Sequence, residues 1–332
     1  MKIAWLTFTE TGYELAQTIA VQIGGSVARC GTQNPLRDWT ANHFAASDAL
    51  IFVGAAGIAV RAVAPHVVSK TSDPAVLVMD ECGQYVIPIL SGHLGGANDL
   101  AKEIHAVCGA HPVLTTATDV RGVFAVDEWA KRQNCAIANP KNIKVISSAV
   151  LRGERVSVYS PWEIIGEMPD FICSVDAPEF AMVQLATHKT TGDALVLVPR
   201  VLTLGIGCRK GTALDSFEAA FSDFLRETNV LEQAISGAAT ITLKKNEPGL
   251  LEFCEKHGWK LTAVSAQELE QIPGTFTASP FVRSVTGVDN VCERSAVSVS
   301  GGVLIQTKYV SHGVTLALAC APYHPDWRWK NE

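Results

Sequence analysis

The sequence predicts an α/β protein made of two α/β domains with mainly parallel sheets, joined by a small middle subdomain. Short apolar runs of strand length alternate with amphipathic stretches of helix length in both halves of the chain. Hydrophobic residues fill 48% of the 332 positions and charged residues 18%, which is ample material for buried cores. A central stretch with several prolines and no regular pattern separates the halves. We place an N-terminal domain at 1–125, a middle subdomain or linker at 126–199, a C-terminal domain at 200–322 and a tail at 323–332.

In the N-terminal domain, apolar runs bounded by turn residues predict strands, and the 3.6-residue pattern predicts helices. Residues 2–8 form the first predicted strand, and the helix that follows at 10–23 stops at Gly24-Gly25. Further strands are predicted at 49–53, 75–79, 85–90 and 113–116, with a turn at 80–83 and a helix at 97–107. Because loops at the carboxyl ends of parallel strands carry the ligands of such folds, we expect the chemistry in the segments that follow the strands.

Beyond residue 125 the pattern weakens and then recovers. Helices at 126–133 and 142–152 and an extended segment at 155–159 are predicted for the middle. In the C-terminal domain, strands are predicted at 201–206, 239–243, 260–264, 303–307 and 314–319, and helices at 212–227, 247–257, 267–272 and 290–299.

Composition excludes several classes of protein. The longest apolar run, at 49–60, falls far short of the ~20 residues that a membrane-spanning helix needs, and Glu10 interrupts any signal-peptide stretch. We therefore expect a cytoplasmic protein without a membrane partner. The nine cysteines are scattered and odd in number, which disfavours disulfides and paired-cysteine zinc sites. A net charge of −6 provides no field that attracts nucleic acid, so an anionic ligand would have to be held by local cations.

One glycine-rich turn, GIGCRKG at 205–211, follows a predicted strand and opens a predicted helix. Its third glycine comes one residue late for a dinucleotide fingerprint, and its lysine precedes the last glycine, the reverse of a P-loop. The turn is still a candidate anion cradle, with Arg209 and Lys210 adding charge at a helix N-terminus. The alternative is a glycine-lined turn with solvated cations.

A second glycine-rich turn, SGHLGG at 91–96, places an imidazole between glycines that let a ligand approach the backbone. His93 is therefore a candidate for proton transfer, and the alternative is an ordinary loop histidine. Ser91 lacks the glycine of a nucleophile elbow, since position 89 is Ile, and this disfavours a serine hydrolase.

Hydroxyl groups and a carboxylate gather farther along the chain, at Thr115, Thr116, Thr118 and Asp119. This cluster could bind acetate or propionate groups or order a water, whereas Asp119 could also simply cap the next helix. Other charged candidates stand at turns or element ends, where solvation or a surface salt bridge is the alternative. They are Arg61, Lys70, Lys244, Glu247, Glu293 and Lys308.

These motifs together resemble a known family. DPAV at 73–76, LSGHLGGAN at 90–98 and TTATD at 115–119 are similar to the N-terminal domain of the cobalt-precorrin-5A hydrolase family (CbiG) of anaerobic cobalamin biosynthesis. GIGCRKGT at 205–212, the stretch 244–249 and TGVDNVCE at 286–293 resemble the C-terminal domain of that family, in the same order along the chain.

The resemblance implies an activity. The substrate would be a cobalt-bearing tetrapyrrole with a δ-lactone that joins the ring A acetate to the former bridging carbon. Opening the lactone and cleaving the adjacent carbon–carbon bond would release acetaldehyde and give cobalt-precorrin-5B. No cofactor is implied, because the substrate carries the cobalt. The implied partner is this small molecule, with possible transient contacts to neighbouring pathway enzymes.

For this reaction we hypothesise that His93 is the general base and that Asp119 orients it or assists the alcohol proton. The backbone amides at Gly95-Gly96, with Ser91 or Asn98, would supply the donors that stabilise the oxyanion. We expect the two domains to face one another across a groove that binds the substrate. The binding residues would be Gly57, Arg61, Lys70, Gly95, Gly96, Asn98, Thr115, Thr116, Thr118, Arg209, Lys210, Lys244 and Glu293.

Two other functions stay open on the sequence. A non-catalytic tetrapyrrole carrier would bind the lactone without releasing acetaldehyde. A nucleotide enzyme of Rossmann type would follow from the α/β pattern alone, but the failed glycine spacing disfavours it.

Overall fold

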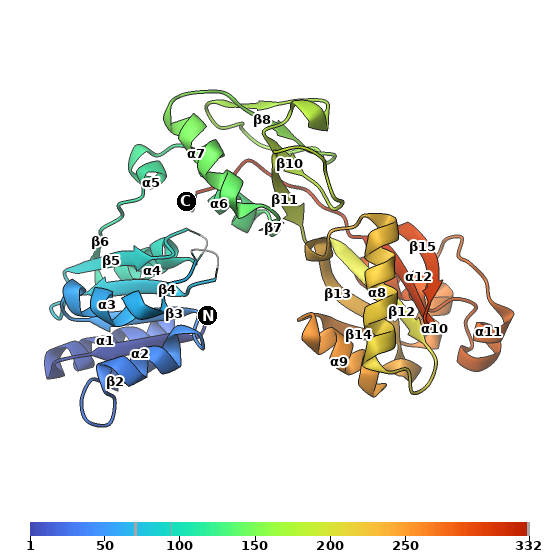
Figure 1. Ribbon diagram of the computed structural model, residues 1–332, viewed down its shortest axis with the longest axis horizontal. Helices are drawn as coiled ribbons and strands as arrows, with labels where there is room; N and C mark the ends of the chain where they lie inside the picture. The colour runs from blue at the N-terminus through green and yellow to red at the C-terminus, as the bar shows by residue number, and fades with distance from the viewer. Residues whose placement is uncertain (70–71, 94, 331–332) are drawn as a thin grey trace. The chain divides into compact units, whose positions relative to one another are not determined.

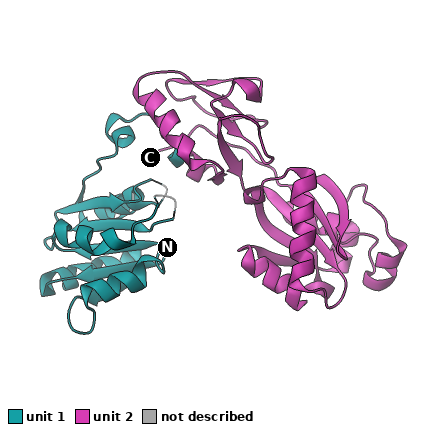
Figure 2. Cartoon of the chain, in the orientation of Figure 1, with its two compact units in different colours: residues 1–128 teal, residues 129–332 magenta. Residues whose placement is uncertain are grey.

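The computed structural model describes residues 1–69, 72–93 and 95–330, and the chain forms two compact units, 1–128 and 129–332 (Figure 2). Unit 1 contains one sheet and unit 2 contains two, each with helices beside it (Figure 1). Most strand pairs in the three sheets are parallel, so the predicted class, α/β with mainly parallel sheets and a middle subdomain, is confirmed. Among the described residues no helix is both long and apolar enough to cross a lipid bilayer.

The sheet of unit 1 has the order β2-β1-β3-β4-β5-β6. Its strands are β1 (Ile3–Thr7), β2 (Ser26–Arg29), β3 (Ala49–Val53), β4 (Ala75–Met79), β5 (Tyr85–Leu90) and β6 (His111–Pro112). Its helices are α1 (Glu10–Ile23), α2 (Leu36–Phe44), α3 (Ala56–Val63), α4 (Ala97–Cys108) and the short α5 (Ala117–Arg121), and α6 (Val126–Arg132) leads into unit 2.

Strands β1, β3 and β4 are buried throughout, because helices cover both faces of the sheet. Successive side chains of a strand point to opposite faces, so Trp5 and Leu6 of β1 enter two different cores. The core containing Trp5 is completed by α1 and α4, whereas Leu6 packs with Trp39 of α2 and Ala59 of α3. This two-sided burial explains why these strands are continuous apolar runs.

The direction of β5 decides where its loop lies. β5 is antiparallel to β4, and Leu90 pairs with Val76, so the turn after β5 lies at the edge where β4 begins. Residues 54–57 follow β3 and lie at the opposite edge, where Gly54 donates to the carbonyl of Met79. β6 is parallel to β5, and therefore the segments that follow β5 and β6 run to the same edge of the sheet.

The first sheet of unit 2 has the order β7-β11-β10-β8-β9 and forms the middle subdomain. It contains β7 (Cys135–Ile137), β8 (Val156–Tyr159), β9 (Ile172–Ser174), β10 (Val183–Leu185) and β11 (Leu195–Pro199), with helix α7 (Ile143–Leu151). The tail of the chain returns to this part. Trp327 stacks on Trp129 at 5.1 Å between ring centroids, and the Trp129 indole donates to the carbonyl of Asp326 at 2.7 Å.

Removing the Trp327 side chain should therefore destabilise the middle subdomain. Trp327 is only 4% exposed, and truncation of a buried tryptophan to alanine costs about 3–5 kcal/mol. We expect Trp327→Ala to lower the midpoint of urea unfolding of unit 2, as measured by circular dichroism. His324→Ala, at an exposed position of the same tail, is the control, and equal midpoints for the two variants would contradict a packing role for the tail.

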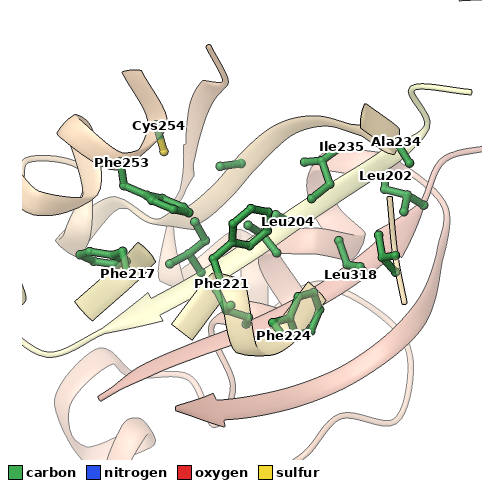
Figure 3. Packing of buried hydrophobic residues seen from close by; sticks show 14 of the residues in the cluster. Leu202, Leu204, Phe217, Phe221, Phe224, Ala234, Ile235, Phe253, Cys254 and Leu318 are labelled. Atoms are coloured by element: carbon green, nitrogen blue, oxygen red, sulfur yellow. The ribbon is translucent and has the colours of Figure 1, made fainter. Parts of the chain in front are cut away.

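The second sheet of unit 2 has the order β14-β13-β12-β16-β15. Its strands are β12 (Leu202–Cys208), β13 (Ile235–Ile241), β14 (Lys260–Val264), β15 (Val303–Ser311) and β16 (Val314–Cys320), and its helices are α8 (Leu214–Thr228), α9 (Pro248–Lys256), α10 (Ala266–Gln271), α11 (Pro280–Thr286) and α12 (Cys292–Ser300). Phe217, Phe221 and Phe224 recur on one face of α8 and pack on Leu204 of β12 and Phe253 of α9 (Figure 3).

Candidate active site

The turn SGHLGG is held by contacts within itself and to the segment before β4. Ser91 has a left-handed backbone conformation, with φ 53°, and its hydroxyl donates a hydrogen bond to the carbonyl of Asp73 at 2.9 Å. A Cβ atom at Gly95 would lie 2.4 Å from the Cβ of Ser91, so only glycine fits there. The Ser91 hydroxyl thus anchors the turn, which argues against its predicted role as an oxyanion donor.

The backbone amides at the start of α4 are also engaged. Gly96 donates to the carbonyl of His93 at 3.0 Å, Ala97 to Ser91 at 3.2 Å and Asn98 to Gly92 at 2.9 Å. These bonds fold the turn back on the helix and satisfy donors that a helix N-terminus otherwise leaves open. The expected oxyanion donor at Gly96 is therefore occupied, and this part of the sequence hypothesis is corrected.

His93 lies between two carboxylates. Its Nε2 is 2.9 Å from Oδ2 of Asp119 in α5, and its Nδ1 is 3.1 Å from Oδ2 of Asp127 in α6. The exposed fractions of the three side chains are 11%, 19% and 10%. The structure thus brings the imidazole turn and the hydroxyl-rich segment together. We call His93, Asp119 and Asp127 the proton-transfer cluster.

The contacts within the cluster set the protonation states of its members. Burial works to lower the pKa of His93, but the hydrogen bonds and charges of Asp119 and Asp127 outweigh it and raise this pKa to about 10. Burial works to raise the pKa of Asp119, yet the hydrogen bond and charge of His93, with Lys102 and Asn98, lower it. His93 is therefore an imidazolium at neutral pH, with both ring N–H groups donating to carboxylates.

Asn98 supports the cluster from α4. This side chain is 3% exposed, and its Nδ2 donates to Asp119 Oδ2 at 2.8 Å and to Thr116 Oγ1 at 3.3 Å. Asn98 was expected to bind substrate, but it positions Asp119 instead. Thr118 is buried, and its hydroxyl has no hydrogen-bond partner within the described chain, whereas Thr115 is exposed. The residue before α5 is Thr116, so Asp119 is not the cap that the alternative interpretation required.

Asp127 was missed from the sequence. The available signal was the acidic pair Asp127-Glu128 directly after the apolar stretch 123–126, where a buried charge needs a partner. The described residues form no metal centre. Within 1–69, 72–93 and 95–330 there is no group of three or more His, Cys, Asp or Glu side chains that could hold a metal ion.

The structure does not bring Gly57 to His93. Gly57 follows β3 at the opposite edge of the sheet, and the Arg61 guanidinium donates to the Gly57 carbonyl at 3.2 Å. The predicted grouping fails because β5 is antiparallel to β4, which the short turn at 80–83 could have indicated. Lys70 lies outside the described residues.

In unit 2, a common cavity is lined by Arg209, Lys210 and Lys244, whereas Glu293 is not part of its lining. The Glu293 carboxylate is fully buried and accepts four hydrogen bonds: from the Thr277 amide and hydroxyl, both at 2.7 Å, from Asn290 Nδ2 at 2.9 Å and from the Lys308 amide at 2.6 Å. It is neither a surface salt bridge nor open to a substrate, so both expectations for Glu293 are wrong.

Comparison with known proteins gives matches along almost the whole chain. Family models described as Cobalamin synthesis G N-terminal, Cobalamin biosynthesis central region and Cobalamin synthesis G C-terminus match residues 38–119, 124–198 and 202–319. The chain is 33% identical to the cobalt-precorrin-5A hydrolase of Salmonella typhimurium, over 96% of this chain and 97% of that protein. It is also 33% identical to the cobalt-precorrin-5A hydrolase of Priestia megaterium, over 82% and 79%.

Proposed function

The chain belongs to the cobalamin synthesis G family, and from this premise we propose that its proton-transfer cluster opens the lactone of cobalt-precorrin-5A. The enzyme is a hydrolase of cobalamin biosynthesis, the activity that its relatives carry. The observation that supports the site is the position of His93, 2.9 Å from Asp119 and 3.1 Å from Asp127, in a turn within the N-terminal family match. The cobalt belongs to the substrate in this proposal.

The reaction sets three requirements. Water must lose a proton as its oxygen attacks the lactone carbonyl, the oxyanion must be stabilised, and the carbon–oxygen bond of the lactone must break. The alkoxide that is freed then forms the carbonyl of acetaldehyde, and the electron pair of the broken carbon–carbon bond passes into the conjugated macrocycle. A base beside a fixed positive charge serves these steps.

We assign the base to Asp119 rather than to His93. A protonated imidazole with both N–H groups bonded has no lone pair for water, so the general-base role first hypothesised for His93 does not fit this geometry. Asp119 is ionised, and it is the most exposed member of the cluster. Its Oδ2 receives His93 and Asn98, which orients the carboxylate, and its Oδ1 would take the proton of water. His93 would hold Asp119 ionised and place positive charge near the oxyanion.

Acetaldehyde release tests the proposal against the carrier alternative. Purified protein is incubated with the cobalt-bound lactone, and acetaldehyde is followed with an alcohol dehydrogenase and NADH. We expect catalytic release far above the background of buffer with lactone. Tight binding of the lactone with acetaldehyde at background level would overturn the hydrolase proposal in favour of a carrier.

The pH dependence of the rate separates the two assignments of the base. A neutral histidine base with the ordinary pKa of 6.5 would give a rate that rises through pH 6.5. In the proposed cluster, Asp119 is ionised even below its ordinary value of 3.8, and His93 keeps its proton up to about pH 10. We therefore expect kcat/KM to stay level between these limits and to fall as the pH rises through 10. A clear inflection near pH 6.5 would return the base to His93.

Stability should follow the same limits. The raised pKa of His93 contributes stability that is fully present below pH 6.5 and is lost as the pH rises through about 10. The lowered pKa of Asp119 contributes stability above pH 3.8 that is lost as the pH falls through its folded value.

A further inference from the structure

A cavity in unit 2 is lined by none of the residues of the proton-transfer cluster. It has a volume of about 430 Å³ and lies among β12, β15 and α11, and we call it the C-terminal pocket. Its lining includes four cationic residues, Arg209, Lys210, Lys244 and Lys308. Much of the remaining lining is apolar, including Ile241, Phe281, Val282, Val285, Val291 and Val310.

The charged residues of the pocket lining are all cationic. Lys244 is paired with Glu247 at 3.0 Å, and each side chain is only 12% exposed. Arg209 and Lys210 are exposed and form no ion pair with any residue of the described chain, and the same holds for the Lys308 ammonium group. In a chain of net charge −6, this local excess of cations favours an anionic ligand.

The glycine-rich turn beside the pocket is not a phosphate loop. The Gly211 amide donates to Glu247 Oε2 at 2.9 Å, so a carboxylate of the protein already holds the donor that a phosphate would need. The other glycines are explained by packing. A Cβ at Gly205 would lie 1.8 Å from the Cys292 carbonyl oxygen, and a Cβ at Gly207 would lie 2.4 Å from Thr315 Oγ1. The backbone of this turn therefore offers no cradle for the phosphates of a nucleotide, and an anionic ligand would be held by the cationic side chains of the lining.

The apolar wall is unusually open to solvent. Phe281 is 74% exposed, Val310 63% and Val285 57%, although all three line the pocket. Adjoining exposed apolar side chains rimmed by charge are typical of a ligand surface. The volume lies at the small end of ligand pockets, ~300–1,000 Å³, so a tetrapyrrole could insert only one edge.

We propose that the C-terminal pocket binds the carboxylated edge of a corrin-type macrocycle, with the acid arms at Arg209, Lys210 and Lys308 and the ring against Phe281 and Val285. This inference rests on the proposed function for the identity of the ligand. It adds that unit 2 has a binding site of its own, made of residues outside the proton-transfer cluster.

The test is binding of cobyrinic acid, a cobalt corrin with free acid arms, to the full chain by equilibrium dialysis, read by the visible absorbance of the corrin. Its fully methyl-esterified form keeps the ring and removes the charges. We expect the ester to bind about tenfold more weakly or worse, because charge-assisted hydrogen bonds are lost. The double variant Arg209→Ala/Lys210→Ala should raise the Kd for the acid by about tenfold, and Lys245→Ala, an exposed neighbour outside the lining, should not.

Phe281→Ser supplies an independent variant, since it should weaken both the acid and the ester. Equal Kd values for the native chain and the Arg209/Lys210 double variant would overturn the proposal, and so would displacement of cobyrinic acid by ATP at a comparable concentration. Asp119→Asn, in unit 1, keeps the two proposals apart. Loss of acetaldehyde release in Asp119→Asn, with an unchanged Kd for cobyrinic acid, would support both sites. Binding of cobyrinic acid by the native chain without hydrolysis of the lactone would overturn only the proposed function.

Discussion

Replacing Asp119 by asparagine is expected to lower kcat/KM for lactone opening by about 100-fold or more, the usual size of a lost acid–base contribution. The side chain keeps its volume, and an amide oxygen can still accept the hydrogen bond from His93 Nε2, 2.9 Å away. An amide cannot take a proton from water, so the variant removes the proposed base with little change in shape. Initial rates of acetaldehyde release from the cobalt-bound lactone measure the effect.

The matched control is Glu103→Gln, which makes the same change of carboxylate to amide at an exposed position of α4 in the same unit. Glu103→Gln should keep the native rate, and far-ultraviolet circular dichroism should show that both variants are folded. An Asp119→Asn enzyme with near-native kcat/KM would show that the base lies elsewhere. A rate loss that appears only in KM would assign Asp119 to binding instead.

The fold could be predicted wherever the sequence carries a clear local pattern of apolar residues. Residues 10–23, 49–53, 75–79 and 85–90 form the predicted elements, because each is an apolar or amphipathic run closed by turn residues. β2 and α2 were not predicted. β2 is an edge strand with no fully buried residue, and α2 is mostly polar around Trp39 and Phe44. Their positions depend on contacts with β1 and the sheet rather than on local pattern.

The candidate site shows the same division. The sequence indicated that the segments at 91–96 and 115–119 would meet, and His93 does contact Asp119, although the strand predicted at 113–116 is formed by His111–Pro112 instead. It could not show that His93 would face carboxylates on both sides, because Asp127 belongs to a helix that begins after α5. Asp119 and Asp127 together raise the pKa of His93. The sequence gives histidine its ordinary pKa and so suggests a base, and it could not show that these contacts keep His93 protonated.

Glu293→Ala is expected to destabilise unit 2 by at least about 3 kcal/mol, because each buried donor left without an acceptor costs about 1–3 kcal/mol. The carboxylate accepts from Thr277, Asn290 and Lys308, and so it joins the loop before α11 to the N-terminus of α12 and to β15. From the sequence alone, Glu293 is an acidic residue near the start of a predicted helix. Only the topology shows that it has become the acceptor for three separate segments.

Urea unfolding of unit 2, followed by circular dichroism, measures the effect, with Glu252→Ala on the exposed face of α9 as control within about 0.5 kcal/mol of the native chain. Glu293→Gln should fall between them, since an amide keeps one acceptor oxygen but turns an NH₂ group toward donors. A substrate-binding carboxylate would behave differently: its removal would raise KM and leave the unfolding midpoint in place. That result would mean that the four hydrogen bonds of Glu293 contribute little, and the structural role assigned to it would be wrong.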